Sequence, residues 1–376
     1  MSKAAEQAQQ IQQDVWIEIN RAHLLHNFGL LQDAAGPNTG ILAVIKANAY
    51  GHGLPEVAQT LKDKAVYLGV ASLHDALSLK TIVPAEKIFL FGRMLDAKLP
   101  AAVAEDFTLS VSGHEEARDI AELSGKLGKI SRIHIKVDTG MGRMGIPFRD
   151  ALPVIKKIAG LKHLTPEGIY THFPSADAEN GFTEKQLHDF SLLLEALDRK
   201  GIRFRYRHAA NSAAALRIRT PILNLCRPGL LLYGISAISP VPTNHFKPVL
   251  SMKARVLLTK RLAAGDSAGY GRSFIAEKPV NIAVLPVGYS HGYPFRCSGR
   301  AEVLYKGKRY PVAGRVSMDY LIICLGNDTA SVGEDMTLIG SSAADAITAE
   351  EIADWAGTIP YEVVTRLPLT VPRLVV

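Results

Sequence analysis

The most constraining feature of this 376-residue sequence is a series of eight short apolar segments that alternate with segments of helical period. The apolar segments span residues 40–47, 66–72, 87–92, 107–112, 132–138, 167–173, 204–210 and 223–229. Short apolar runs of this kind are typical of strands buried on both faces, as in parallel sheets. Eight such units predict an α/β fold, a (β/α)8 TIM-type barrel, which needs about 200 residues or more. A doubly wound open sheet is the competing architecture, but we expect no G-x-G-x-x-G loop after any of these strands, which disfavours it.

The rest of the chain has a different pattern of apolar and turn residues. Beyond about residue 245, short strand-like segments are separated by Gly, Asp and Asn turns, which predicts a mostly antiparallel β domain. Residues 15–34 read as a strand followed by an amphipathic helix. We therefore expect a flexible tail over 1–12, a barrel over 13–245 and a C-terminal β domain over 246–376, since a chain of this length usually forms two cores.

Composition excludes several classes of protein. The net charge is +7 and the isoelectric point is near 9.2, but Lys and Arg are scattered, which disfavours a nucleic-acid partner. The polar start "MSKAAEQAQQIQQD" is no secretory signal, and no apolar stretch approaches a membrane span. Three cysteines without a metal or disulfide spacing fit a reducing compartment. We expect a cytoplasmic protein that binds neither nucleic acid nor membrane.

Reactive side chains gather where the predicted strands end. Lys46, Lys136, His172, His208 and Arg227 each stand at or near the carboxyl end of a different segment. A single histidine or lysine at a strand end is more often structural. In a barrel, however, all these ends meet on one rim, which is where barrel enzymes carry their active sites. The sequence therefore predicts an active site on this rim.

The last two barrel segments suggest a phosphate site. In "HAANSAAAL", Asn211 and Ser212 stand where a helix begins, so we expect Ser212 to cap that helix and offer a hydroxyl. In "RPGLLLYG", Gly229 and Leu230 offer backbone N–H groups. Barrels often bind phosphate at this place, although an ordinary cap and turn is the alternative.

A lysine, a phosphate site and an arginine on one rim are what pyridoxal 5'-phosphate requires. Lysine forms an imine with its aldehyde, and an Asp or Arg faces its ring nitrogen. Arg227 would take the second role, and an arginine cannot give up its proton. It therefore donates to an unprotonated ring nitrogen, which leaves the ring a weaker electron sink. This arrangement suits a reaction that only moves a proton.

Motifs along almost the whole chain resemble those of the alanine racemases. They include "AVIKANAYGHG", "HIKVDTGMGRMG", "HAANSAA", "NLCRPGLLLYG", "AGYG", "LPVGYSHGYP", "GRVSMD" and "YEVVTRL". The resemblance implies an isomerase (EC 5.1.1.1) that interconverts L- and D-alanine with pyridoxal 5'-phosphate and supplies D-alanine for peptidoglycan. It also implies a homodimer whose active sites are shared across the interface.

The resemblance assigns roles to the central residues. Lys46 would hold the cofactor covalently and act as the base on one face of the substrate. Tyr270 would be the base on the other face, reaching in from the second subunit. Arg143 would bind the cofactor phenolate oxygen and lie near the substrate carboxylate. Lys136 resembles a lysine that is often carbamylated in this family.

Other roles follow from the same resemblance. His172 would pack on the cofactor ring and bond Tyr270, and His208 would orient Arg227. The backbone of Met318 would bind the substrate carboxylate, Tyr289 would line the entry, and Asp319 would support them. The remaining cofactor-binding residues, mostly around the phosphate, would be Tyr50, Asn211, Ser212, Gly229, Leu230 and Tyr361.

Alternatives remain at this point. Ser290, His291 and Ser317 depart from the family pattern near the entry, so a racemase of broader specificity is one alternative. A pyridoxal-phosphate barrel decarboxylase would be expected to place a carboxylate on the ring nitrogen, where this chain has Arg227. A non-catalytic pyridoxal-phosphate-binding protein would lack the second domain. A metal hydrolase would need an HxH pair on an early strand, where "AYGHG" has one histidine.

Overall fold

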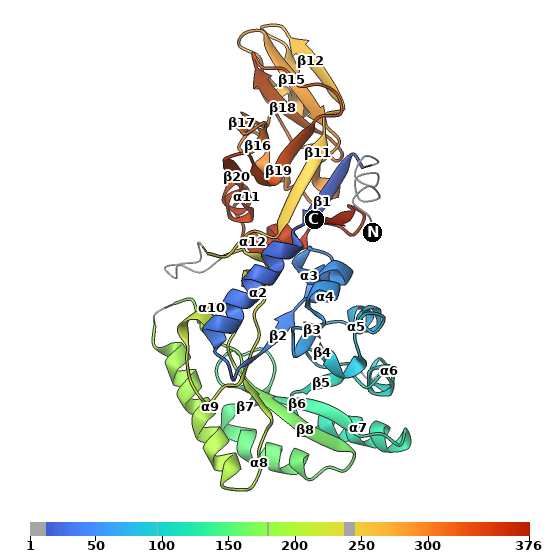
Figure 1. Cartoon of the computed structure of the whole chain (residues 1–376), viewed down its shortest axis with the longest axis vertical. Coiled ribbons are helices and arrows are strands. Elements are labelled where there is room, and N and C mark those ends of the chain that lie inside the picture. The colour runs from blue at the N-terminus through green and yellow to red at the C-terminus, as the bar shows by residue number, and fades with distance from the viewer. Residues whose placement is uncertain (1–12, 96, 179, 237–244) are drawn as a thin grey trace.

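The computed structural model describes residues 13–95, 97–178, 180–236 and 245–376 as two parts arranged end to end (Figure 1). One part is a barrel with helices around it, and the other is built mainly from antiparallel sheets. The predicted tail over 1–12 lies outside the described residues.

The barrel consists of eight parallel strands in the order β10-β2-β3-β4-β5-β6-β8-β9. Between β9 and β10, the Asn224 N–H donates to the Arg207 carbonyl at 3.0 Å and the Arg227 N–H to the Ala210 carbonyl at 2.8 Å, so the ring is nearly closed. The predicted barrel is confirmed. The strands are β2 (Gly40–Val44), β3 (Tyr67–Val70), β4 (Ile88–Leu90), β5 (Thr108–Val111), β6 (Ser131–Asp138), β8 (Leu164–Tyr170), β9 (Tyr206–His208) and β10 (Leu225–Cys226).

Helices cover the outside of the barrel, as in every βα unit. In α8, Ala151, Ile155 and Ile158 are buried while Lys156 and Lys157 are exposed, which is the helical period read from sequence. These helices are α2 (Arg21–Ala35), α4 (Leu54–Leu61), α5 (Leu73–Leu79), α6 (Leu99–Ala104), α7 (His114–Lys126), α8 (Phe148–Ala159), α9 (Phe182–Asp198) and α10 (Ser212–Arg217).

The second part contains a sheet of order β17-β16-β19-β11-β1-β21, with β20 paired to β19. Its first strand in sequence, β1 (Val15–Ile19), was expected within the segment 13–245, but it pairs antiparallel with β11 and parallel with β21. Both edges of β1 are thereby occupied, which buries its apolar residues. The other strands are β11 (Leu250–Arg255), β16 (Glu302–Tyr305), β17 (Lys308–Pro311), β19 (Asp335–Ser342), β20 (Asp345–Ile347) and β21 (Arg373–Val375).

Two smaller antiparallel sheets, β12-β15-β18 and the pair β13-β14, complete the second part. The expectation of a mostly antiparallel β domain is confirmed. The strands are β12 (Leu258–Leu262), β13 (Ser267–Ala268), β14 (Phe274–Ile275), β15 (Val280–Leu285) and β18 (Leu321–Gly326).

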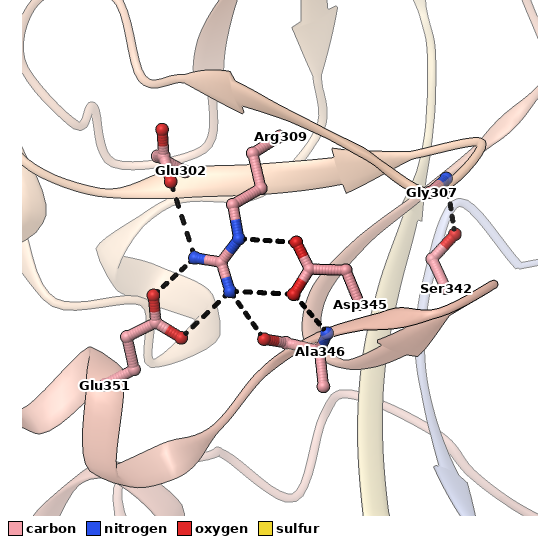
Figure 2. A network of polar contacts seen from close by, with 7 residues as sticks. All are labelled: Glu302, Gly307, Arg309, Ser342, Asp345, Ala346 and Glu351. Atoms are coloured by element: carbon pink, nitrogen blue, oxygen red, sulfur yellow. Dashed lines mark hydrogen bonds and ion pairs between the residues drawn. The ribbon is translucent and has the colours of Figure 1, made fainter.

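A charged network joins the large sheet to helix α11 (Ala349–Ala356), as Figure 2 shows. The Arg309 guanidinium on β17 binds the Asp345 carboxylate at 2.6 and 3.0 Å and also pairs with Glu351 of α11. It donates to the Ala346 carbonyl at 2.7 Å. This forked binding gives one side chain a fixed geometry, which isolated surface ion pairs lack.

The two parts meet at the carboxyl rim of the barrel. Helix α12 (Pro360–Thr365) of the second part packs on the segment that follows β2, where Gly51 has a φ of +81°. A Cβ atom on Gly51 would lie 1.9 Å from the Val364 carbonyl oxygen. Only glycine therefore allows this close approach.

Among the described helices, none is long and apolar enough to cross a membrane.

We predict that Gly51→Ala destabilises the protein by about 3 kcal/mol or more, because it combines positive φ with a backbone clash. Gly128→Ala is the matched control: Gly128 also has a positive φ of +65°, but a Cβ there meets nothing within 4 Å. It should cost only about 1 kcal/mol. Thermal unfolding of both variants measures the difference, and equal losses would contradict the close contact.

Candidate active site

A cavity of about 640 Å³ opens at the carboxyl ends of the barrel strands, where α12 covers the rim. Most of the sequence-predicted site residues line it. They are Lys46, Tyr50, Lys136, Arg143, His172, Asn211, Ser212, Arg227, Gly229, Leu230 and Tyr361.

Lys46 begins a left-handed turn, α3 (Lys46–Tyr50), directly after β2. Ala47, Asn48, Ala49 and Tyr50 all have φ between +53° and +55°. A left-handed helical conformation costs non-glycine residues roughly 1–2 kcal/mol each, so surrounding contacts must hold it. One of them is the Asn48 side chain, which accepts a hydrogen bond from the Leu54 N–H at 2.8 Å. The turn places both Lys46 and Tyr50 at the cavity wall.

A residue from the end of the chain also holds this turn. The Arg373 guanidinium on β21 donates to the Gly51 carbonyl from Nη2 at 2.9 Å and from Nε at 3.2 Å. The same guanidinium donates to the Leu367 carbonyl at 3.1 Å. The second part of the molecule thus fixes the segment that carries the candidate catalytic lysine.

The cavity is strongly cationic. Five of its lining residues are positively charged: Lys46, Arg93, Lys136, Arg143 and Arg227. Among the described lining residues, Asp177 is the single acidic one. Such a surplus of positive charge favours anionic groups such as phosphate and carboxylate.

The cations affect the two lysines. Burial, and then the nearby Arg143 charge, lower the pKa of Lys46. Burial, Arg143 and Arg227 lower the pKa of Lys136 to about 8. A lysine with a lowered pKa is neutral more often at physiological pH, and a neutral amine is the nucleophilic and basic form.

Arg227 is buried, with 4% of its surface exposed. Its Nη2 donates to the carbonyls of Thr171 at 2.8 Å and Ala209 at 3.0 Å, and its Nη1 donates to His208 Nδ1 at 2.9 Å. Nη2 also lies 3.2 Å from His172 Nδ1. Within the described part of the chain, neither Nε nor the second hydrogen of Nη1 has such a bond, and Arg227 lines the cavity, so Nε is a donor available to a ligand.

Both histidines at this arginine are neutral. Burial and then the Arg227 charge lower the pKa of His172 to about 3 and that of His208 well below its ordinary value. Because a guanidinium only donates, Nδ1 of each ring must be the unprotonated nitrogen. A metal ion would compete with Arg227 for these lone pairs and be repelled by its charge, which disfavours the metal hydrolase alternative.

The helix start at 211–212 differs from the sequence expectation. Asn211, and not Ser212, is the N-cap of α10, because its side chain accepts from the Ala214 N–H at 3.0 Å. Ser212 Oγ instead accepts from the Gly229 N–H at 3.0 Å, so that N–H is not free. Ser212 keeps its own hydroxyl hydrogen for a ligand in the cavity.

Comparisons with known proteins give the family. The sequence model of the alanine racemase N-terminal domain matches residues 19–237, and that of the alanine racemase C-terminal domain matches 249–375. The chain belongs to the alanine racemase family. An alanine racemase from Carboxydothermus hydrogenoformans is 38% identical over 96% of this chain and 99% of the relative. One from Geobacter sulfurreducens is 35% identical over 95% and 96%.

Solved structures agree with the sequence comparisons. An alanine racemase from Clostridium difficile 630 has a TM-score of 0.91 at 30% identity, covering 97% of this chain and 96% of that one. The alanine racemase from Bacillus anthracis with bound L-Ala-P has a TM-score of 0.87 at 32% identity, covering 97% and 95%.

Four residues that the family resemblance assigns to the site lie outside the cavity of their own chain. Tyr270 is 71% exposed on the second part of the molecule, and Tyr289 and Met318 are also exposed. Asp319 accepts a hydrogen bond from the Ser290 hydroxyl at 2.8 Å, next to Met318. The loop around residues 314–319 contacts both the Tyr270 loop and the Tyr289 loop, so these residues share one surface.

Two residues at this site, Tyr170 and Arg373, were not predicted from the sequence. Tyr170, at the end of β8, stacks on His208 with centroids 4.7 Å apart and lies under the Lys136 and Arg227 charges at 5.6 and 5.2 Å. No role was assigned to Tyr170 from the sequence, because an aromatic residue in an apolar run carries no signal of a site. Arg373 gave no signal either, because its target is distant in sequence.

The loop after β6 carries the glycine spacing of a dinucleotide-binding loop, G-x-G-x-x-G, over residues 140–145. The expectation that no such loop follows a predicted strand is therefore wrong. In the structure, Asp138 accepts hydrogen bonds from the N–H groups of Gly140, Met141 and Gly142 at 2.8–3.1 Å. A carboxylate of the chain itself therefore occupies the N–H groups that a phosphate would need.

Proposed function

We propose that this protein interconverts L- and D-alanine with pyridoxal 5'-phosphate bound to Lys46. The observation that carries the proposal is the joint placement of Lys46 and the Arg227 Nε donor on one cationic cavity. Membership of the alanine racemase family supports it. The cofactor, when bound, withdraws electrons from the substrate and makes its Cα proton acidic.

The cavity residues fit the phosphate of this cofactor. Tyr50 Oη has no hydrogen bond in the described part of the chain and lines the cavity beside Ser212 and Leu230. A Cβ on Gly229 would lie 2.6 Å from Tyr50 Oη, so glycine is what lets this hydroxyl approach the backbone. Tyr361, whose ring centroid is 6.1 Å from that of Tyr50, completes the set of donors. Asn211 holds the helix that carries Ser212.

Arg227 fits the ring nitrogen. The Thr171 and Ala209 carbonyls accept from its Nη2 and His208 accepts from Nη1, while Nε has no partner among the described residues and is available to a ligand in the cavity. Because arginine stays protonated, it donates to an unprotonated nitrogen and moderates electron withdrawal. This favours proton movement alone over the decarboxylase chemistry that a carboxylate at this position would support.

Racemisation needs a proton removed from one face of the substrate and delivered to the other. Lys46, with its lowered pKa, would serve one face. Tyr270 of a second copy would serve the other, because Tyr270 lies outside the cavity of its own chain. His172 Nε2 carries the hydrogen of its neutral ring and could bond that phenol.

A homodimer accounts for the exposed surface around Tyr270. Tyr270, Tyr289, Phe295, Met318 and Tyr320 are each between 46% and 71% exposed on the second part. Exposed aromatic residues gathered in this way mark an interaction surface. We propose that a second copy covers it, placing Tyr289 and the Met318 backbone, supported by Asp319, at the entry and carboxylate site.

Lys136 is proposed to carry a carbamate. Its pKa of about 8 leaves roughly a tenth of the amine neutral at pH 7. The neutral nitrogen attacks the carbon of CO2, an N–C bond forms, one C=O π bond opens to a carboxylate, and a proton leaves to solvent. The product is an anion that can accept hydrogen bonds from Arg143, which lines the same cavity and which we propose binds the phenolate oxygen and the substrate carboxylate.

The proposed product is D-alanine for peptidoglycan, made in the cytoplasm. Cys226, Cys297 and Cys324 are all free thiols, which supports a reducing compartment. The departures Ser290, His291 and Ser317 lie on the surface assigned to the partner's entry, so broader substrate specificity is the second candidate. A racemisation assay over alanine, serine, lysine and arginine distinguishes the two.

We predict that Lys46→Ala abolishes the visible absorbance of lysine-bound cofactor and lowers alanine racemisation by at least about 100-fold, because both the anchor and one base are removed. Lys162→Ala, at an exposed lysine, should change neither. Persistent absorbance in Lys46→Ala would refute the anchor assignment.

We predict that Lys46→Ala and Tyr270→Phe, each inactive alone, recover activity when mixed and allowed to exchange subunits. Each mixed dimer has one site with both native residues, so random exchange yields about a quarter of the wild-type sites. Racemisation by the mixture measures this. No recovery, with exchange verified by a tagged subunit, would argue against sites shared between two copies.

We predict that protein incubated with ¹³C-labelled bicarbonate shows a carbamate resonance by ¹³C NMR that Lys136→Ala lacks. The signal should grow as the pH rises through about 8, because the neutral amine is the reacting form. Lys185→Ala, at an exposed lysine, should keep the signal. A signal unaffected by Lys136→Ala would contradict the modification site.

A further inference from the structure

Three buried side chains form a row behind the cavity: Arg227, His208 and His134. Arg227 Nη1 lies 2.9 Å from His208 Nδ1, and His208 Nε2 lies 2.8 Å from His134 Nδ1. Both histidines are fully buried, and neither lines the cavity. His134 lies on β6, two residues before Lys136, and none of the roles described above uses it.

The hydrogen on each ring can be assigned from these partners. Arg227 only donates, so His208 Nδ1 is an acceptor and the His208 hydrogen is on Nε2. His208 Nε2–H then donates to His134 Nδ1, which places the His134 hydrogen on Nε2. Burial lowers the pKa of both rings, that of His134 to about 3, so each ring has one hydrogen. The described residues offer His134 Nε2 no partner.

The surrounding residues hold the His134 ring in place. Phe89 packs against it with centroids 4.9 Å apart, and Tyr67 meets it edge-on at 5.5 Å. Opposite, a Cβ on Gly168 of β8 would lie 2.5–2.6 Å from the ring. The absence of a side chain at Gly168 on the neighbouring strand therefore leaves the space that this imidazole fills. A ring held so closely presents its Nδ1 to His208 in one geometry.

We propose that His134 is a positioning residue: its Nδ1 accepts the one hydrogen of His208 and holds that ring with Nδ1 toward Arg227, which aims Arg227 Nε into the cavity. This inference rests on the proposed function, in which Arg227 faces the ring nitrogen of the cofactor. Such outer partners fix the orientation and tautomer of a histidine that contacts a reactive centre.

Loss of this acceptor has a specific consequence. Without the His134 Nδ1 acceptor, the His208 Nε2–H is buried with no partner. The other tautomer of His208, with its hydrogen on Nδ1, then no longer loses a hydrogen bond at Nε2. That second tautomer turns its N–H toward the Arg227 N–H. Two donors then face each other, and the guanidinium must move. An acceptor at position 134 is therefore the property that matters, more than an imidazole as such.

The experiment compares His134→Gln, which keeps an acceptor oxygen, with His134→Leu, which does not. Phe89→Leu is the matched control, since it loosens packing on the same ring without changing a hydrogen bond. The first readout is the ¹⁵N NMR shift pair of His208 in cofactor-free, ¹⁵N-histidine-labelled full-length protein, assigned with His208→Gln. We expect a protonated Nε2 and an unprotonated Nδ1 in the wild type, His134→Gln and Phe89→Leu, and mixed tautomers in His134→Leu.

The second readout is the steady-state kinetics of the holoenzyme. We expect His134→Leu to lower kcat about 10–100-fold with KM within about threefold, and His134→Gln to stay within about threefold of the wild type. Wild-type His208 with its hydrogen on Nδ1 would overturn the proposal. So would equal losses in His134→Gln and His134→Leu, or wild-type behaviour of His134→Leu.

The two readouts distinguish a failure of the His134 proposal from a failure of the proposed function. Should His134→Leu not fold, the wild-type shifts and His134→Gln decide: a retained His208 tautomer supports the proposal, and a lost one overturns it. Absence of racemase activity in the wild type would refute the proposed function, whereas the imidazole shifts of the cofactor-free protein test the role of His134 independently.

Discussion

The Arg227 guanidinium carries a buried positive charge that no carboxylate of the described residues pairs with. A buried ion costs several kcal/mol unless its hydrogens are satisfied. Here the Thr171 and Ala209 carbonyls and two imidazoles accept them, so the ends of β8 and β9 are arranged around one side chain. Burial, and then the same charge, lower the pKa of His172 and His208 and keep both neutral, which leaves the cationic character of the cavity to its lysines and arginines.

The two parts of the molecule divide the work of the site. The barrel supplies the lysine, the arginine and the phosphate donors, all on strand ends or on the turns that follow them. The second part supplies α12 and β21, which hold the strained turn behind Lys46. It also carries Tyr270 on an exposed face, away from its own cavity. The site is therefore incomplete in one chain under the proposed function.

Much of the fold was predictable from sequence, because buried parallel strands and amphipathic helices leave local apolar patterns. Lys46 and Arg227 were recognisable because reactive side chains stand at the carboxyl ends of several such strands, which meet on one rim of a barrel. The pairing of β1 with β11 was not predictable, since register between segments over 200 residues apart leaves no local signal. His134 on β6 and Tyr170 at the end of β8 were not singled out, because both belong to apolar segments and carry no signal of their own. The left-handed turn at Ala47–Tyr50 is imposed by tertiary contacts and not by residue preference.

The contact between Arg373 and the Gly51 carbonyl spans 322 positions of sequence. Closing so long a loop costs conformational entropy, which the native contacts must offset. The strand that carries Arg373, β21, is itself paired with β1, so the turn behind Lys46 is held through a pairing of the two ends of the chain. A barrel without that pairing would lack one of the contacts that hold its lysine segment in place.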